Sequence, residues 1–321
     1  MLLVFPSIIG IMASGLSPQR SILVTGANKG QGFALCERIL SEHADTHVFL
    51  CSRDIQKGQQ AASQLASSFS PDRVDLIQLD VTNEQSVLEA CSQVEKKLSG
   101  TRKLFGVASN AGILWDYTLE ELIDVCAIGV QRVLDGFLPL LEDGGRVIVV
   151  SSGLGPLMHG YSSQERKDAM TSRDCTWKDL QRMISECLGL ADTSPEQFEK
   201  IGFPGGPFAE SAPDFHMYGL AKMFADAYML SLTRKFPNLH INSCDPGLVF
   251  TDLIGKIPRY DGKAFEETGA KTPADGVEAA MRLLFGASQD GVALEENGNF
   301  YAMSKDGTEL LHSGIDKLPN K

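Results

Sequence analysis

Residues 22–32 read Ile-Leu-Val-Thr-Gly-Ala-Asn-Lys-Gly-Gln-Gly, a short apolar strand that runs into a glycine-rich turn. Residues 33–41, directly after it, have the pattern of a helix. Glycines in such a turn let the backbone approach a pyrophosphate, and the helix N-terminus supplies amide donors. A glycine triplet alone is a weak signal, because ordinary turns are also rich in glycine. Its place in the first β-α-β unit favours a dinucleotide site at Gly26, Asn28, Lys29, Gly30, Gln31 and Gly32.

The alternation of apolar strands and helix-like stretches continues along the chain. Further strands are predicted at residues 48–51, 74–79, 104–108, 146–150, 240–244 and 299–303. Helices are predicted at residues 55–67, 84–98, 119–141, 218–234 and 274–285. This order is typical of an α/β, Rossmann-type doubly wound parallel sheet, here of about seven strands. Residues 21–321 are therefore interpreted as a single domain.

The alternation breaks between residues 153 and 217. Residues 177–190 are amphipathic, and Ser194-Pro195-Glu196 has the N-cap and first-turn proline of a helix start. The segment is too small for a core of its own, and the sheet pattern resumes after it. We interpret it as a helical insertion, expected to cover the mouth of the substrate site and one flank of the helix that carries Tyr218.

Residues 1–20 form an apolar leader of uncertain kind. A secretory signal has a basic start, which is absent here, and a membrane span needs about 20 apolar residues. A flexible leader, or an upstream extension with Met12 as an alternative start, is favoured over a weak membrane anchor. We therefore expect no attachment to a membrane.

The composition excludes several classes of function. The net charge is −12 and no cluster of Lys and Arg forms a stripe, so nucleic acid is a poor candidate partner and a small molecule a better one. The seven cysteines include no Cys-x-x-Cys pair. Reduced thiols in a cytoplasmic protein explain them more simply than disulfides or a metal site, and no metal is expected.

The second strand ends in Ser52-Arg53, where NAD-binding units carry an acid for the ribose 2′-hydroxyl. Arg53 and Lys29 can instead pair with a 2′-phosphate, since no carboxylate stands at position 52 or 53 to repel it. We therefore predict that the cofactor is NADPH/NADP+ rather than NADH. The alternative for Arg53 is an ordinary surface charge that pairs with Asp54.

Two further segments follow predicted strands. Asp80 and Val81 come after the third strand and are expected beside the adenine. Asn110, Ala111 and Gly112 come after the fourth and are expected to run along the cofactor. A loop asparagine that makes a local hydrogen bond is an equally ordinary reading of Asn110.

The strongest chemical signal is Tyr218-Gly219-Leu220-Ala221-Lys222 at the start of a predicted helix. The i, i+4 spacing places the phenol and the ammonium on one face, so that Lys222 stabilises a phenolate and lowers the pKa of Tyr218. Such a phenol is a usable proton donor. The alternative is an amphipathic helix with a surface lysine. Ser152, after the fifth strand, adds a hydroxyl that can hold the substrate oxygen.

In order along the chain, the turn 25–32, Asn110-Ala111-Gly112, Ser152, Tyr218-x-x-x-Lys222 and Pro246-Gly247-x-x-x-Thr251 resemble the short-chain dehydrogenases/reductases. The resemblance runs over residues 21–303. Gly26-Ala27-Asn28-Lys29-Gly30, Ser52-Arg53-Asp54 with Gly58, and the long insertion are similar to the monomeric NADPH-dependent carbonyl reductases and their salutaridine reductase-like relatives.

This resemblance implies reduction of a ketone, aldehyde or quinone by hydride transfer. Tyr218 would protonate the carbonyl oxygen, Lys222 would bind the nicotinamide ribose, and Ser152 would orient the carbonyl. Thr251, after Pro246-Gly247, would contact the carboxamide end of the cofactor. It also implies a monomer, because the insertion covers a helix region that commonly forms the interface in oligomeric relatives.

The chain departs from the family pattern at one catalytic position. The family usually has an asparagine three residues before a glycine on the helix after the fourth strand, and here Cys126 precedes Gly129 in that way. That departure keeps a second reading open, a catalytically weak protein that binds and senses NADP(H). A third, a membrane-attached lipid or steroid dehydrogenase, rests only on the leader.

Overall fold

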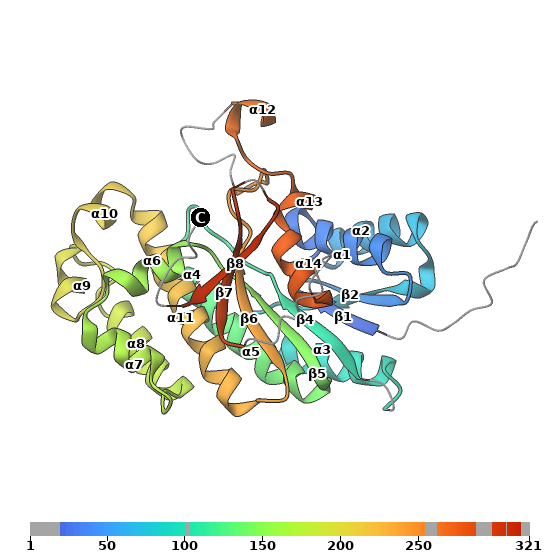
Figure 1. Cartoon of the computed structure of the whole chain (residues 1–321), viewed down its shortest axis with the longest axis horizontal. Coiled ribbons are helices and arrows are strands. Elements are labelled where there is room, and N and C mark those ends of the chain that lie inside the picture. The colour runs from blue at the N-terminus through green and yellow to red at the C-terminus, as the bar shows by residue number, and fades with distance from the viewer. Residues whose placement is uncertain (1–19, 101–102, 254–261, 287–296, 306, 316–321) are drawn as a thin grey trace, which may run out of the picture.

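The computed structural model describes residues 20–100, 103–253, 262–286, 297–305 and 307–315. An eight-stranded sheet runs through its centre in the order β3-β2-β1-β4-β5-β6-β7-β8 (Figure 1). The strands are β1 (Arg20–Val24), β2 (Thr46–Ser52), β3 (Val74–Gln78), β4 (Leu104–Ser109), β5 (Leu141–Val150), β6 (His240–Asp245), β7 (Asn299–Met303) and β8 (Leu310–Gly314). All neighbours pair in parallel except β7 and β8.

The predicted doubly wound sheet is confirmed. The chain leaves β1 toward β2 and β3 on one side and returns to place β4 on the other, so the winding direction reverses between β1 and β4. Ligands bind at this kind of reversal, outside the carboxyl ends of the strands. The sequence analysis missed β8, whose five residues at the edge of the sheet are too few for a clear periodic signal.

A hydrophobic core lies on each face of the sheet. One face is covered by α1 (Gly30–Glu42), α2 (Ile55–Ser68) and α14 (Glu278–Phe285), which bury residues such as Leu35, Leu65 and Leu284. The other is covered by α3 (Glu84–Lys97), α5 (Gly129–Phe137) and α11 (Pro213–Lys235). Helices on both faces explain why the strands are nearly continuous apolar runs.

The predicted helix 119–141 is interrupted. It consists of α4 (Leu119–Ile123), a π-helical segment (Asp124–Ile128), α5, and a 3₁₀ turn (Leu138–Leu140), and β5 already begins at Leu141. The π segment widens the helix where Gly129 packs against Val81, so closely that a Cβ at position 129 would lie 2.9 Å from the valine side chain. Single π turns frequently mark functional positions, and this one contains Cys126.

Helix α11 begins at Pro213, earlier than predicted, so Tyr218 lies in its second turn. Proline is suited to the first turn because that position needs no amide donor. From Gly219 to Met229 each residue of the helix is buried. A helix buried all round has no polar stripe, and here the sheet covers one side while the insertion covers another.

The insertion forms a cluster of short helices against α11 (Figure 1). They are α6 (Leu154–Tyr161), α7 (Gln164–Thr171), α8 (Trp177–Leu188), α9 (Glu196–Lys200) and α10 (Gly206–Ser211). Edge-to-face aromatic contacts connect the insertion to α11. The ring centroids of Trp177 and Tyr228 lie 5.0 Å apart, and those of Phe203 and Phe224 lie 5.7 Å apart. The insertion therefore covers one flank of α11, as expected from the sequence.

The chain after β6 is more divided than predicted. It contains α12 (Phe265–Thr268) and α13 (Pro273–Gly276), and α14 follows after Val277. Gly276 packs so closely on Val249 that a Cβ there would lie 2.5 Å from the valine side chain. A short 3₁₀ turn (Pro71–Arg73) precedes β3.

Apart from Arg20, the leader 1–20 lies outside the described residues. Within the part that is described, no helix is long and apolar enough to cross a membrane, and no group of His, Cys, Asp and Glu is arranged to hold a metal ion. All seven cysteines are free.

Candidate active site

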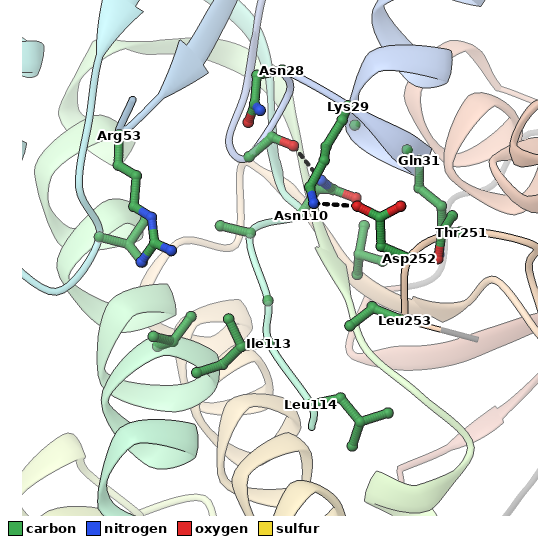
Figure 2. Close-up of a pocket in the computed structure, with 18 of the residues that line it drawn as sticks. Asn28, Lys29, Gln31, Arg53, Asn110, Ile113, Leu114, Thr251, Asp252 and Leu253 are labelled. Carbon is green, nitrogen blue, oxygen red and sulfur yellow. Dashed lines mark hydrogen bonds and ion pairs between the residues drawn. The ribbon is translucent and has the colours of Figure 1, made fainter. Parts of the chain in front are cut away.

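A cavity of about 600 Å³ opens at the carboxyl ends of the parallel strands (Figure 2). Its wall includes Gly26, Asn28, Lys29, Gly30, Gln31, Gly32, Arg53, Asp80, Val81, Asn110, Ala111, Gly112, Tyr218, Lys222, Pro246 and Thr251. The fold thus brings most of the predicted site residues to one place. Of the described residues, Ser152, Cys126 and Gly247 were also predicted but do not belong to this wall.

The glycine-rich turn leaves no space for a side chain at Gly26 or Gly32. A Cβ at Gly32 would lie 2.4 Å from the carbonyl oxygen of Gly26, and one at Gly26 would lie 2.9 Å from Ala111 Cα. Gly26 and Gly30 have φ of 63° and 56°, which glycine adopts readily. No described side chain caps the first turn of α1, so its amides can bind an anion. This cradle fits the pyrophosphate of a dinucleotide.

Asn110 holds the cradle together. Its side-chain Nδ2 donates to the carbonyl oxygen of Thr25 at 2.9 Å, while Thr25 Oγ1 accepts from the amides of Asn110 and Ala111 at 2.9 and 3.0 Å. The turn after β1 is thereby tied to the turn after β4. The alternative of a local hydrogen bond does not describe Asn110, because its side chain bonds to a turn 85 residues away while the residue lines the cavity.

Lys29 and Arg53 share the cavity but do not meet. The Lys29 ammonium forms an ion pair with Asp252, on the loop after β6, and Figure 2 shows Arg53 approaching from another side. Among the described residues the Arg53 guanidinium has no ion-pair partner, because the Asp54 carboxylate caps α2 and pairs with Lys57. The structure therefore places one cation of the predicted pair on a carboxylate rather than toward a shared phosphate site.

Of two other predicted cofactor contacts, Asp80 has a local hydrogen-bond partner and Thr251 packs against the glycine-rich turn. Asp80 Oδ1 accepts from the amide and the hydroxyl of Thr82 at 3.0 and 2.7 Å. Thr251 packs its methyl group near Gly30, 3.4 Å from where a Cβ would stand. Gly247 has φ of 76°, and a Cβ there would lie 3.5 Å from Lys271 Nζ.

Tyr218 and Lys222 lie on one face of α11, as their spacing predicts. Lys222 Nζ donates to the carbonyl oxygen of Val150 at 2.7 Å and stands 5.5 Å from the centroid of the Tyr218 ring. Only 3% of Lys222 is exposed, which excludes the alternative of a surface lysine. The ammonium is thus fixed between the end of β5 and the phenol.

Lys222 lowers the pKa of Tyr218, as predicted, but burial of the phenol outweighs this effect. Burial raises the pKa of Tyr218 to about 12; the charge of Lys222 lowers it, but not enough, and Cys126 and Asp245 raise it further. Burial also lowers the pKa of Lys222, yet the negative forms of Tyr218, Cys126 and Asp226 outweigh this and raise it. At neutral pH the pair is therefore a protonated phenol beside an ammonium.

Two adjacent serines end β5 and have different environments. Ser151 lines the cavity, but its Oγ donates to the Asp226 carboxylate at 2.9 Å. Ser152 is half-buried, and its Oγ accepts from the amide of Leu154 at 3.3 Å, within its own turn. In this structure the predicted substrate-orienting hydroxyl therefore faces the start of α6.

Cys126 lies in the π segment, which packs against α11, and is fully buried. Its thiol donates a weak hydrogen bond to the carbonyl oxygen of Ile113 at 3.6 Å. A Cβ at Gly112 would lie 3.8 Å from both Cys126 Sγ and Lys222 Nζ, so the thiol and the ammonium flank the same glycine. The position that resemblance assigned to an asparagine is thus next to Lys222.

Sequence analysis missed the apolar part of the wall, formed by Ile113, Leu114, Trp115, Tyr117, Val125, Phe250 and Leu253. Trp115 packs against Phe215 at 5.1 Å between ring centroids, belongs to a cluster with Tyr218, and donates its indole N–H to the carbonyl oxygen of Leu253. The sequence contained a signal for this apolar surface, because the apolar run Ile-Leu-Trp directly follows the predicted cofactor segment Asn110-Ala111-Gly112.

The prediction that the insertion covers the substrate mouth does not describe this cavity. None of residues 153–217 belongs to its wall among the described residues. The apolar sides of α6 to α8 are buried against α11 instead. The insertion reaches the site only indirectly, through the ring of Phe215 behind Trp115.

A family model described as short chain dehydrogenase matches residues 20–164. Carbonyl reductase [NADPH] 3 of Rattus norvegicus is 31% identical over 272 residues, which cover 80% of this chain and 90% of the relative. The chain belongs to the short-chain dehydrogenase/reductase family, which confirms the resemblance. It is an oxidoreductase with carbonyl reductase-like relatives.

Two further similarities cover nearly the same span. Short-chain dehydrogenase/reductase 1 of Saponaria officinalis is 28% identical over 292 residues, which cover 81% of this chain and 90% of that protein. The solved structure of salutaridine reductase from Papaver somniferum superposes with a TM-score of 0.68 at 23% identity, over 88% of this chain and 99% of that one. The second likeness supports the fold.

Proposed function

We propose that this chain reduces the carbonyl group of a small organic molecule with NADPH, and that Tyr218 donates the proton. The observation that carries the proposal is the shared cavity: Tyr218 and Lys222 line the same wall as the uncapped N-terminus of α1 and its glycine-rich turn. The residues that would hold a dinucleotide and the phenol that would donate the proton thus face one cavity. The apolar surface beside Trp115 then receives the substrate.

NADPH bound there supplies a hydride to the carbonyl carbon. Tyr218 holds the proton that the carbonyl oxygen needs, and its raised pKa keeps the phenol protonated at neutral pH. That protonation state suits reduction, because the reverse oxidation needs a phenolate to accept the proton. Lys222 stabilises the phenolate that forms as the proton leaves, since its ammonium is held nearby by Val150. The apolar wall excludes water from the reacting atoms.

The preference for NADPH rests on Arg53 and, more weakly, on Lys29. Arg53 lines the cavity without an ion-pair partner among the described residues, so its guanidinium can take a 2′-phosphate. The Lys29–Asp252 pair is solvent-exposed, with 67% and 78% of the two side chains accessible. Exposed pairs contribute little free energy, so a phosphate dianion can displace Asp252 from Lys29.

The test is to follow the absorbance of NADPH while the purified protein is offered ketones, aldehydes and quinones. Turnover in the wild type that is lost in Tyr218→Phe, with NADPH binding retained, supports the proposal. Binding of NADPH without consumption across the whole panel contradicts it.

A second candidate, an NADP(H)-binding sensor with little turnover, is favoured by two observations. Cys126 replaces the usual asparagine, and the Ser152 hydroxyl is bonded within its own turn rather than facing the cavity. In that case the same panel gives tight NADPH binding and no oxidation, and restoring the asparagine does not produce turnover.

We also propose that the protein is a cytoplasmic monomer. The insertion helices occupy the flank of α11, where a second copy would otherwise pack, by analogy with oligomeric relatives. Light scattering at the mass of a dimer or tetramer would contradict the monomer. Attachment to a membrane stays an alternative for the leader, and fractionating the full chain against one that starts at Met12 separates the two cases.

A further inference from the structure

Asp226 is a carboxyl group buried directly behind the candidate active site. It lies one helical turn after Lys222 on α11, and only 2% of the residue is exposed. Burial raises the pKa of Asp226 to about 7; the Ser151 and Ser243 hydroxyls and Lys222 lower it without offsetting this, and Asp245 raises it. A charge at this depth is costly unless an opposite charge and hydrogen bonds compensate it, so the contacts of Asp226 decide its charge state.

Asp226 joins the catalytic helix to the turn that follows β5. Its Oδ2 accepts from Ser151 Oγ at 2.9 Å. Gly155, at the other end of the same turn, fits against it so closely that a Cβ there would lie 2.3 Å from Oδ2. The turn between them contains Ser152 and starts beside Val150, whose carbonyl oxygen holds Lys222. One carboxyl group therefore sets the distance between the serine turn and α11.

The second carboxyl oxygen of Asp226, Oδ1, lacks a hydrogen-bond partner among the described residues. Among the described residues, Asp226 Oδ1 and the neighbouring Ser243 Oγ are both fully buried and neither makes a hydrogen bond of normal geometry. The charged and titratable groups that act on Asp226 are Lys222 from its own helix and Asp245 and Cys244 from β6, while α6 presents Gly155. Lys222 is the cation among them.

We propose that Asp226 is a positioning residue that clamps the turn 151–155 to α11 and sets how much of the Lys222 charge acts on Tyr218. This inference rests on the proposed function. When Asp226 is ionised, it balances the ammonium and weakens the stabilisation of the Tyr218 phenolate. When Asp226 is protonated, the full field of the ammonium acts on the phenol, and proton donation to the substrate is easier. Asp226 exchanges no proton with the substrate.

The experiment separates the charge from the clamp. Asp226→Asn keeps an acceptor for Ser151 and removes the titration, whereas Asp226→Leu removes both. For the wild type, with menadione as the probe quinone, kcat is expected to fall roughly three- to tenfold between about pH 6 and pH 8, the effect of one charge screened by protein and solvent. Asp226→Asn should show no such fall, and Asp226→Leu should in addition raise KM because the turn is released.

Two variants act as comparison and control. Ser243→Ala removes a hydroxyl that lowers the Asp226 pKa, so the midpoint of the fall should move to higher pH. Asp135→Asn removes another carboxylate that is bonded to α11, through the hydroxyl of Tyr228 at 2.5 Å, but lies outside the cavity wall, and its pH profile should match the wild type. If Asp226→Asn fails to fold, the Ser243→Ala shift still tests the proposal.

A readout without substrate keeps this proposal distinct from the proposed function. The melting temperature of Asp226→Asn relative to wild type should rise with pH up to about pH 7, because only the wild type must bury a carboxylate. If the protein turns over but the kcat profiles of wild type and Asp226→Asn coincide, the inference is overturned and the proposed function stands. If no probe is reduced while the melting difference follows pH, the proposed function fails but the titration of Asp226 does not.

Discussion

Two lysines, Lys29 and Lys222, face the same cavity in opposite surroundings. Lys29 is exposed at the mouth and pairs with Asp252 in water, whereas 3% of Lys222 is exposed and its ammonium is held by a carbonyl oxygen beside a buried phenol. Charges in water are screened, and their partners are exchanged at little cost. Charges inside the protein set the pKa of their neighbours. Lys29 at the mouth can therefore exchange its ion-pair partner, whereas Lys222 in the interior is fixed and affects the pKa of Tyr218.

The largest expected effect is a loss of turnover on substitution of Tyr218 or Lys222 in the interior of the cavity. Tyr218→Phe should lower kcat by at least about 10²–10⁴-fold, the usual range for general acid–base catalysis, with NADPH affinity nearly unchanged because only one hydroxyl is lost. Lys222→Ala should lower both kcat and NADPH affinity, since in the proposed mechanism its ammonium serves the phenol and the nicotinamide ribose. Rapid-mixing kinetics and fluorescence titration with NADPH measure the two. Equal cofactor affinity in the two variants would contradict this division of roles.

The next effect concerns stability at Asp226. Its pKa is raised in the folded protein from the ordinary 3.8 to about 7, so between these values the folded state binds more protons than the unfolded state. Stability attributable to this group is therefore highest at low pH and is lost as the pH rises to about 7. Since one pKa unit corresponds to about 1.4 kcal/mol, the loss amounts to up to about 4 kcal/mol.

Asp226→Asn lacks this loss, so the difference in unfolding free energy between the variant and the wild type should grow from about pH 4 to about pH 7 and then stay constant. Urea denaturation at a series of pH values measures it. A difference that is independent of pH would show that the carboxyl does not titrate in this range.

A smaller effect is expected at the mouth. Arg53→Ala should cost about 1.5–3 kcal/mol of NADPH affinity and much less of NADH affinity, as for a hydrogen bond to a charged group. Because Asp252 competes for Lys29, Asp252→Asn should strengthen NADPH binding by up to about 1 kcal/mol, the range of an exposed pair. Calorimetric titration with both cofactors decides. An unchanged preference in Arg53→Ala would remove the basis for NADPH selectivity.

The smallest effect is at Cys126. We propose that an asparagine at this position would hold a water that relays protons to Lys222 better than the thiol does, because a thiol is a weak hydrogen-bond partner and this one bonds to Ile113 at 3.6 Å. Cys126→Asn should therefore raise kcat by about two- to tenfold, part of the acid–base contribution, with little change in NADPH affinity. Steady-state kinetics on a variant with a wild-type circular dichroism spectrum tests this. An equal or lower kcat would indicate that Cys126 only fills space.

Features that depend on neighbours in the chain were predictable. Each of these features depends on residues close together in the sequence. They are the glycine-rich turn between β1 and α1, the i, i+4 pair of Tyr218 and Lys222, and the alternation of strands and helices. The backbone geometry of a strand, a turn or a helix converts such spacing directly into position. The doubly wound sheet and the shared cavity follow from these short-range patterns together with the handedness of parallel crossovers.

What only the tertiary structure decided involves partners far apart in sequence. Asp252 forms an ion pair with Lys29, and Asp226 accepts a hydrogen bond from Ser151. The insertion helices pack on α11 rather than over the cavity. The pKa of Tyr218 belongs to this group, because burial outweighs the local effect of Lys222. Sequence spacing places a charge on a helix face, but the pKa depends on how much water the whole fold removes from that face.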